Sequence, residues 1–368
     1  MKITCDTLNL SKALDTVQRA AQNKVTSNTN NGFYISASEG HIEFQANDYS
    51  IGIKTTCHGI IEEEGTVVIA SPYLSEMIRR LPEYTVTLEQ KSGENLIRIT
   101  SGKTKYSLPI KNTDDFPLIQ EIDHTNCCTI PNAVMKDMIN LTQYAVSTDK
   151  QKPLFTGILF EIKENNFTMT ATNTHQLAAK EVSLEELAKA TGRFIVPSGV
   201  LSEVARLLPV EDDGKVEISW ARSHVAFTFG DTYFLSTLIS GEYPDWHRII
   251  PSQFITSVTL SLKDFSDAVG RVALLARNTE YKKINFLFEN DAVRIFGEDR
   301  VSGEAEDNVP AKVEGEPAKV IFNCFYIEDI LKHSRGDTVT LHIPKAGPML
   351  VEQEEDKQYT YVVTPMRG

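Results

Sequence analysis

Residues 74–82 read LSEMIRRLP, and residues 201–209 read LSEVARLLP. The two stretches begin 127 positions apart, share six of nine residues and differ in side-chain class at one position, where Arg80 matches Leu207. A match of this length within one chain indicates an internal repeat. Repetition shifts the question from a single catalytic pocket to what several equal modules build together.

Other echoes keep nearly the same spacing. Phe116-Pro117 after two aspartates is answered by Tyr243-Pro244 after Gly-Glu, again 127 positions later. The triplets AND, ATN and GED begin at residues 46, 171 and 297, and similar openings begin at residues 3, 128 and 258. A period near 126 divides the 368 residues into three units. We therefore predict domains at residues 1–125, 126–253 and 254–368.

Composition is typical of a globular protein, with 41% hydrophobic and 24% charged residues. No apolar run is long enough to span a membrane, and the N-terminal MKITCDTLNL lacks the apolar core of a secretory signal. The five cysteines form no CxxC motif, so we expect buried thiols and a cytoplasmic protein. The net charge of −13 argues against nucleic acid unless the cations gather on one surface.

Each third of the chain predicts two amphipathic helices among short strands. Apolar residues recur at helical spacing near residues 10–21, 72–81, 134–145, 197–208, 265–272 and 325–334, and Pro72 and Pro197 suit first turns. Segments such as TVTLEQ, KYSLPI and GILFEIKENNFTMTAT predict strands and hairpins. The polar residues 298–316 predict a loop between strands. The fold class is therefore α+β with antiparallel sheets.

Motifs of catalysis are absent from the sequence. It holds no glycine-rich phosphate loop, HExxH, GxSxG or dinucleotide fingerprint, and its eight histidines lack metal-ligand spacing. Acidic runs such as Glu62-Glu63-Glu64 stand beside turn residues and are typical of solvated loops. We expect no catalytic residue, cofactor or metal.

Three separated motifs carry a family resemblance. ATNTHQLA at residues 171–178, GEYPDWHRIIP at 241–251 and the C-terminal YVVTPMRG resemble the bacterial beta sliding clamps, the processivity subunits of replicative DNA polymerase. The resemblance covers the whole chain. It implies a nonenzymatic ring of two head-to-tail chains, with six domains and twelve helices around a hole for double-stranded DNA. It also implies that the polymerase, the clamp loader and other clients bind through short peptides.

The polar faces of the predicted helices would line that hole. Their cations would meet duplex phosphates without reading sequence, and the excess acid would lie outside. These DNA-facing residues are Lys12, Arg19, Arg79, Arg80, Lys136, Arg206, Lys263, Arg271, Lys332 and Arg335.

The same cations have a second interpretation. Glu203 precedes Arg206, and Glu76 precedes Arg79, an order that favours the helix dipole and pairing along the helix without DNA. The residues alone leave both interpretations open, and the family resemblance favours DNA.

The resemblance also implies a groove for client peptides that carry apolar and glutamine side chains. Leu177, Pro244, Ile249 and Val362 can form a dry cup, with Met366 as an adaptable wall. The whole implied set is Phe155, Thr172, His175, Leu177, Pro244, Arg248, Ile249, Asn323, Tyr326, Pro348, Val362, Pro365, Met366 and Arg367. His175 is expected to fix a turn.

The chain departs from the family pattern near this groove. Thr174 stands where glycine is common, Gln176 where arginine is common, Thr364 where methionine is common and Gly368 where a larger apolar residue is usual. These departures put the peptide preference in question and leave the fold unaffected.

The family joins the first domain of one chain to the third domain of its partner. The resemblance assigns Tyr106 and Leu108 of an edge strand and Leu274 and Leu275 of a helix to this seam. Lys103 and Lys105 would meet Glu304, Glu306 or Asp307 across it, as rim pairs that set register more than strength.

Two rival functions stay open. A protein-interaction scaffold without DNA would tolerate reversal of the helix cations. A hydrolase built from dispersed carboxylates would show metal-dependent turnover that one Asp or Glu substitution removes.

Overall fold

A computed structural model describes residues 1–21, 32–69, 73–209, 213–277, 279, 281–289, 291–299 and 303–367, without the side chain of Asp299. The chain divides into two compact units. The first contains residues 1–135, 185–191 and 199–238, and the second contains residues 136–184, 192–198 and 239–368. Each unit is described by itself, and the three predicted domain boundaries stay a prediction.

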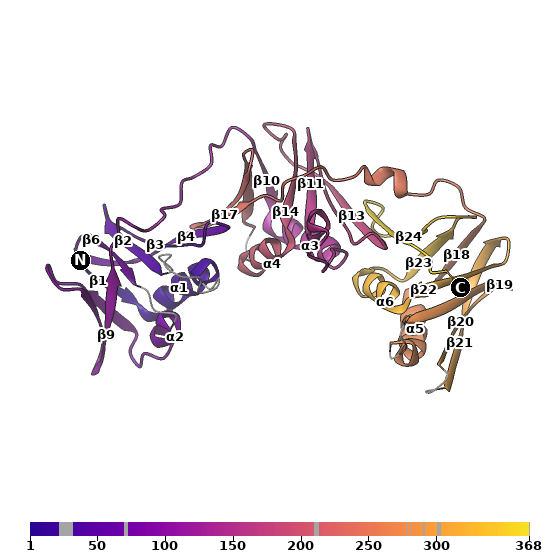
Figure 1. Ribbon diagram of the computed structural model, residues 1–368, viewed down its shortest axis with the longest axis horizontal. Coiled ribbons are helices and arrows are strands. Elements are labelled where there is room, and N and C mark those ends of the chain that lie inside the picture. The colour runs from indigo at the N-terminus through magenta and orange to yellow at the C-terminus, as the bar shows by residue number, and fades with distance from the viewer. Residues whose placement is uncertain are drawn as a thin grey trace. The chain divides into compact units, whose positions relative to one another are not determined.

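The first unit is built on one antiparallel sheet, several strands of which are labelled in Figure 1. Among the described residues this sheet has 13 strands in the order β10-β15-β16-β17-β4-β3-β2-β6-β9-β8-β7-β1-β5. The strands are β1 Lys2–Asp6, β2 Phe33–Ser38, β3 His41–Asn47, β4 Ile51–Cys57, β5 Gly59–Glu63, β6 Gly65–Ile69, β7 Thr85–Glu89, β8 Leu96–Ser101, β9 Thr104–Lys111, β10 Cys127–Pro131, β15 Lys215–Trp220, β16 His224–Phe229 and β17 Thr232–Thr237.

The second unit has a corresponding sheet of 12 described strands. Their order is β14-β11-β12-β13-β25-β24-β23-β18-β21-β20-β19-β22. Their bounds are β11 Gly157–Lys163, β12 Asn166–Thr172, β13 Gln176–Ser183, β14 Gly192–Pro197, β18 Thr256–Ser261, β19 Lys283–Glu289, β20 Ala292–Asp299, β21 Gly303–Gly315, β22 Ala318–Asn323, β23 Thr338–Ile343, β24 Met349–Gln353 and β25 Tyr359–Val363. Antiparallel sheets with helices on them confirm the predicted α+β class.

In the described part of the chain, six α-helices match the six predicted amphipathic segments. They are α1 Thr7–Ala21, α2 Leu74–Arg79, α3 Asn132–Gln143, α4 Ser198–Leu207, α5 Leu262–Ala276 and α6 Cys324–His333, beside two short 3-10 helices, η1 Pro153–Thr156 and η2 Trp246–Ile249. The predicted apolar stripes are largely buried, as Leu14 of α1 and Val269 of α5 illustrate. Helix α1 packs on β3, β4 and α2, and α5 packs on β20, β21 and α6.

Two expectations about these elements were wrong, and one lies outside the described residues. Pro197 ends strand β14 and does not begin α4, because it still pairs with Gly157 of β11. Residues 303–315 form strand β21 and not a loop. Pro72, expected to begin the second helix, falls outside the described part of the chain.

All five cysteines are free and buried, as expected. No helix in the described ranges is long and apolar enough to cross a membrane.

Candidate functional site

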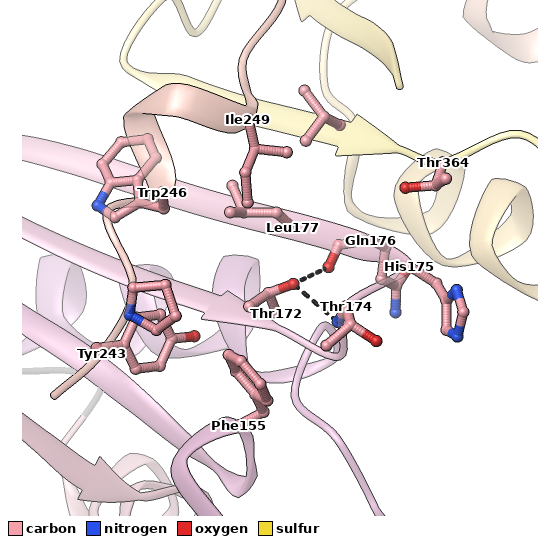
Figure 2. Close-up of a pocket in the computed structure, with 12 residues that line it drawn as sticks. Phe155, Thr172, Thr174, His175, Gln176, Leu177, Tyr243, Trp246, Ile249 and Thr364 are labelled. Carbon is pink, nitrogen blue, oxygen red and sulfur yellow. Dashed lines mark hydrogen bonds between the residues drawn. The ribbon is translucent and has the colours of Figure 1, made fainter. Parts of the chain in front are cut away.

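An apolar pocket lies in the second unit where strands β13 and β25 run side by side (Figure 2). Leu177 and Val362 are direct partners in this strand pair and form its floor. Both belong to a buried cluster that includes Leu159 and Ile195. The cavity has a volume of about 150 Å³, which suits one or two apolar side chains.

The segment after strand β17 supplies one wall of the pocket. Tyr243 and Trp246 are buried there, and Phe155 packs edge-on against Tyr243 with ring centroids 5.7 Å apart. The Trp246 indole N–H donates to Glu161 at 2.7 Å, which satisfies its one polar group. Burial raises the pKa of the Tyr243 hydroxyl, so it stays neutral at physiological pH. This wall is therefore rigid and uncharged.

A tight turn between β12 and β13 forms the opposite wall. The Thr172 hydroxyl donates to the Gln176 carbonyl at 2.6 Å and accepts from the Thr174 N–H at 3.1 Å (Figure 2). The Asn173 carboxamide oxygen accepts from the N–H groups of His175 and Gln176. The His175 backbone takes part in this turn and links it to the strand end beyond β25, because its carbonyl accepts from the Thr364 N–H at 2.8 Å.

Thr174 holds a strained backbone, with φ of 79°. A β-branched residue is disfavoured in this left-handed region by about 1–2 kcal/mol, whereas glycine is not. Thr174 nevertheless lines the pocket.

Replacing Thr174 with glycine is expected to raise the free energy of unfolding by about 1 kcal/mol, because glycine adopts this φ without a steric clash. The urea midpoint of the transition that unfolds this part of the chain measures the change. Thr168→Gly, within strand β12, is the control and should destabilise the protein. A lower urea midpoint for Thr174→Gly than for the unchanged protein would contradict the claim that the Thr174 backbone is strained.

Gln176 is held in the core by both ends of its carboxamide. Its oxygen accepts from the Tyr361 hydroxyl at 2.9 Å, and its nitrogen donates to the Tyr144 carbonyl at 3.4 Å. Only 3% of its surface is exposed. The position where the family commonly has arginine is therefore neutral here and directed inward, so it offers a ligand no positive charge.

The structure brings together half of the predicted groove residues. Seven line this pocket: Phe155, Thr172, His175, Leu177, Pro244, Ile249 and Val362. Pro365 and Met366 instead line a neighbouring groove beside strand β22.

The other five predicted groove residues lie outside the lining of both cavities. The Tyr326 ring stacks near His175 at 6.3 Å, and Asn323 caps α6 by accepting from the Phe325 N–H. Arg248 is 84% exposed and pairs with Asp245, whose pKa is lowered by the His247 and Arg248 hydrogen bonds. Pro348 is half-buried in the β23–β24 turn, and the Arg367 carbonyl accepts from Lys283.

Sequence reasoning missed five lining residues: Thr174, Gln176, Tyr243, Trp246 and Thr364. Tyr243 and Trp246 could have been identified from the sequence, because large aromatic side chains beside Pro244 in a non-repetitive segment are expected to pack against a neighbouring surface. The other three stand at positions that were read only as departures from the family pattern.

The predicted DNA-facing cations are mostly solvent-accessible and mostly ion-paired. Arg19 and Arg206 both contact Glu203, at 3.3 and 3.0 Å, Arg79 contacts Asp15 at 2.7 Å, Arg80 contacts Glu76 at 2.5 Å, Arg271 contacts Asp307 at 2.6 Å, and Arg335 contacts Asp137. Lys12, Lys263 and Lys332 are exposed, whereas Lys136 is half-buried, and none of the four has an ion pair among the described residues.

These pairs support part of the alternative interpretation. Arg80 and Arg206 pair with acids one turn earlier on their own helices, as helix stabilisation requires. Arg79 behaves differently, since its partner is Asp15 on α1 and not Glu76. Exposed pairs of this kind contribute about 0–1 kcal/mol each.

The predicted seam residues occupy two separate surfaces. Tyr106 and Leu108 lie half-buried on one face of β9, which pairs with β8 along its length but with β6 only at Ile110 and Lys111. Lys103 and Lys105 are exposed beside them.

The second surface belongs to α5 and β21. Leu274 is 62% exposed and Leu275 is half-buried at the end of α5. Glu304 is exposed, while Glu306 and Asp307 already pair with Arg294 and Arg271 of the same chain. Pairs across the seam would have to compete with these internal ones.

Comparison with known proteins gives one consistent result. Models of the DNA polymerase III beta subunit match in order: the N-terminal domain at residues 1–120, the central domain at 129–245 and the C-terminal domain at 247–367. A beta sliding clamp of Staphylococcus epidermidis is 29% identical over 346 residues, which cover 91% of each chain.

Solved structures are similar over the entire length. The DNA polymerase sliding clamp from Bacillus subtilis is 26% identical with a TM-score of 0.95, and the alignment covers 100% of this chain and 99% of that one. A putative DNA polymerase III beta subunit from Eubacterium rectale is 25% identical with a TM-score of 0.94, and both chains are fully covered. Because the three domain models together span nearly all of the sequence, the chain belongs to the DNA polymerase III beta subunit family, the beta sliding clamps.

Proposed function

We propose that two copies of this chain close a ring around duplex DNA and tether DNA polymerase III for processive synthesis. The observation that carries the proposal is the match of all three clamp domains in order, with full-length similarity to the Bacillus subtilis clamp. The ring would consist of domains at residues 1–125, 126–253 and 254–368 from each chain. It would act in the cytoplasm as a scaffold without catalysis or cofactor.

Binding of DNA would rest on the exposed cations of the six helices. Several, such as Arg79 and Arg271, already hold a carboxylate in a solvent-exposed pair. Exchange of that carboxylate for a phosphate leaves the number of charge contacts unchanged, so DNA binding is weak. Because the contacts are to phosphates, binding is also sequence-independent and salt-sensitive. Weak contacts suit a clamp that must slide, because the closed ring alone keeps it on DNA.

Client proteins would bind at the apolar pocket with a short peptide. Leu177 and Val362 offer a dry floor to an anchoring leucine or phenylalanine, and Phe155 and Trp246 limit its size. The polar groups of Thr172 and Gln176 form hydrogen bonds within the protein. The pocket would therefore select apolar anchors by shape, with little help from charge.

Deleting residues 365–368 is expected to reduce binding of a client peptide at least a hundredfold. The tail is tied to the fold through Met366, whose N–H donates to Ile321 at 2.7 Å, and Thr364 just before it lines the pocket. Without that tie the rim of the pocket frays. Anisotropy titration of a fluorescent peptide with one glutamine, a leucine and a phenylalanine measures the loss.

The truncated protein must keep the dimer mass of the full chain in light scattering, which controls for misfolding. Unchanged peptide affinity in a correctly assembled truncation would refute the pocket assignment. Gly368 itself lies outside the described residues.

A further inference from the structure

Strand β22 is the last strand of the second unit's sheet, near the C-terminal end of the chain (Figure 1). It pairs with β19 along one side from Ala318 to Asn323. On its other side, the tail touches it at one point, where the Met366 N–H donates to the Ile321 carbonyl at 2.7 Å. The rest of that side is a sheet edge with hydrogen-bonding groups to offer.

The contact with Met366 tells which backbone groups point outward. In an antiparallel strand, the N–H and C=O of one residue point to the same side, and alternate residues point to opposite sides. Because the Ile321 carbonyl points away from β19, the N–H and C=O of Lys319 also point outward. No backbone partner for these two Lys319 groups on that side is found in the described part of the chain.

A groove of about 640 Å³ runs along this edge. Its floor includes Ile343 and Met349, which are buried. The charged residues that line it are Lys319 and Lys345, both exposed, and no carboxylate lines it. The Lys319 ammonium lies over the Phe296 ring at 5.3 Å, a contact that it exchanges for a carboxylate when the groove is occupied. The groove therefore combines an apolar floor, free strand hydrogen bonds and positive charge.

The strands equivalent to β22 in the other two modules indicate what this edge binds. In each module the end of the last strand, or the segment just after it, meets the corresponding strand at one or two residues. Lys111 opposes Val68 and Ile110 opposes Ile69 in the first module, Ile239 opposes Ile195 in the second, and Met366 contacts Ile321 in the third. The strand positions 68, 195 and 321 follow the 126–127-residue repeat.

The second module shows the use of the strand's outer side. After Ile239 the chain continues past the edge, and the Tyr243 carbonyl accepts from the Arg193 guanidinium at 3.0 Å. Arg193 stands two residues before Ile195, as Lys319 stands two residues before Ile321. A cation at this position thus binds the backbone of the segment that passes the edge in the second module, and its counterpart in the third module lines the open groove.

We propose that the β22 edge binds an extended acidic segment of a client protein, adjacent to the peptide that enters the apolar pocket. This inference rests on the proposed function. The segment adds beside β22 through the outward N–H and C=O of Lys319, and its carboxylates face Lys319 and Lys345. Val362 and Thr364 line the pocket while Pro365 and Met366 line the groove, so one tail borders both sites.

The test compares fluorescent client peptides that differ in a four-residue extension. One set carries Val-Asp-Val-Asp and the other Val-Ser-Val-Ser, attached at either end, and anisotropy gives the dissociation constants with the full chain. We expect the acidic extension at one end to tighten binding about tenfold, and high salt to remove most of that gain. The double variant Lys319→Glu, Lys345→Glu should lose the gain and bind the unextended peptide as before.

Two further variants make the test specific. Lys163→Glu, an exposed lysine on strand β11, is the matched control and should keep the gain. Lys319→Pro removes the outward N–H without breaking the ladder to β19 and should lose part of the gain with the charge of Lys345 intact.

Equal gain in the Lys319→Glu, Lys345→Glu variant, or no gain from the acidic extension at either end, would overturn the proposal. So would a mass increase with protein concentration that the double variant abolishes, because the edge would then bind a second copy of the chain. A peptide with the acidic extension alone is titrated in parallel. If the unextended peptide fails to bind, the pocket assignment fails, and this isolated extension still decides whether the edge binds acidic chains.

Discussion

Replacing Leu274 and Leu275 together with alanine is expected to convert the dimer into monomers at micromolar concentration. Leu274 is 62% exposed at the end of α5, where a large apolar side chain contributes little to its own domain. If both leucines are buried against the partner's β9, their truncation costs about 2 kcal/mol each, which is about 4 kcal/mol at each of the ring's two seams. The total of about 8 kcal/mol raises the dissociation constant by about a millionfold. Light scattering or sedimentation gives the mass directly.

The matched control truncates two exposed leucines on other surfaces. Leu118 and Leu187 are 53% and 72% exposed, and their double replacement with alanine should leave the dimer intact. A dimer that survives loss of Leu274 and Leu275 would move the seam away from α5. Loss of the dimer in the control would instead point to a general effect on stability.

Reversing the charge of Arg79, Arg80 and Arg206 to glutamate is expected to reduce loading onto primed circular DNA at least tenfold. Each reversal removes a cation from a helix face and places a carboxylate beside an existing acid, namely Asp15, Glu76 or Glu203. Repulsion from duplex phosphates then replaces attraction, and the deficit grows as salt is lowered. After incubation with the clamp loader, gel filtration separates DNA-bound clamp from free clamp, and the amount of bound clamp measures loading.

A control with the same change in net charge reverses Arg98, Lys163 and Arg222, which lie on strands and a turn. It should load normally. Normal loading of the helix variant would favour the scaffold without DNA and the interpretation of these cations as helix pairs. The hydrolase alternative is tested separately, by any turnover that depends on an added metal.

The helices could be predicted from the sequence because their apolar stripes are local. Leu14 and Val17 face the core for the same reason that they recur at helical spacing. The same reasoning failed for residues 303–315, which were predicted to form a loop. Strand β21 has Glu304, Glu306 and Asn308 on its solvent side and buries few apolar groups, so it resembles a polar loop in sequence.

The pocket could be predicted only in part, because it depends on a strand pair distant in sequence. Leu177 and Val362 meet through the register of β13 with β25, which no local pattern encodes. The ion pair between Arg79 and Asp15 depends on the packing of α2 against α1, so it could not be predicted from the sequence either. The inward hydrogen bonds of Gln176 show that a neutral side chain at this position keeps both ends of its carboxamide paired in the core.

Topological retention on DNA tests the central claim most directly. The protein is loaded on a sealed plasmid circle, and the bound fraction is followed before and after a restriction enzyme cuts the circle once. A closed ring held by its shape should stay on the sealed circle for many minutes and slide off the cut one. Equal release from sealed and cut plasmid would contradict a ring that encloses DNA.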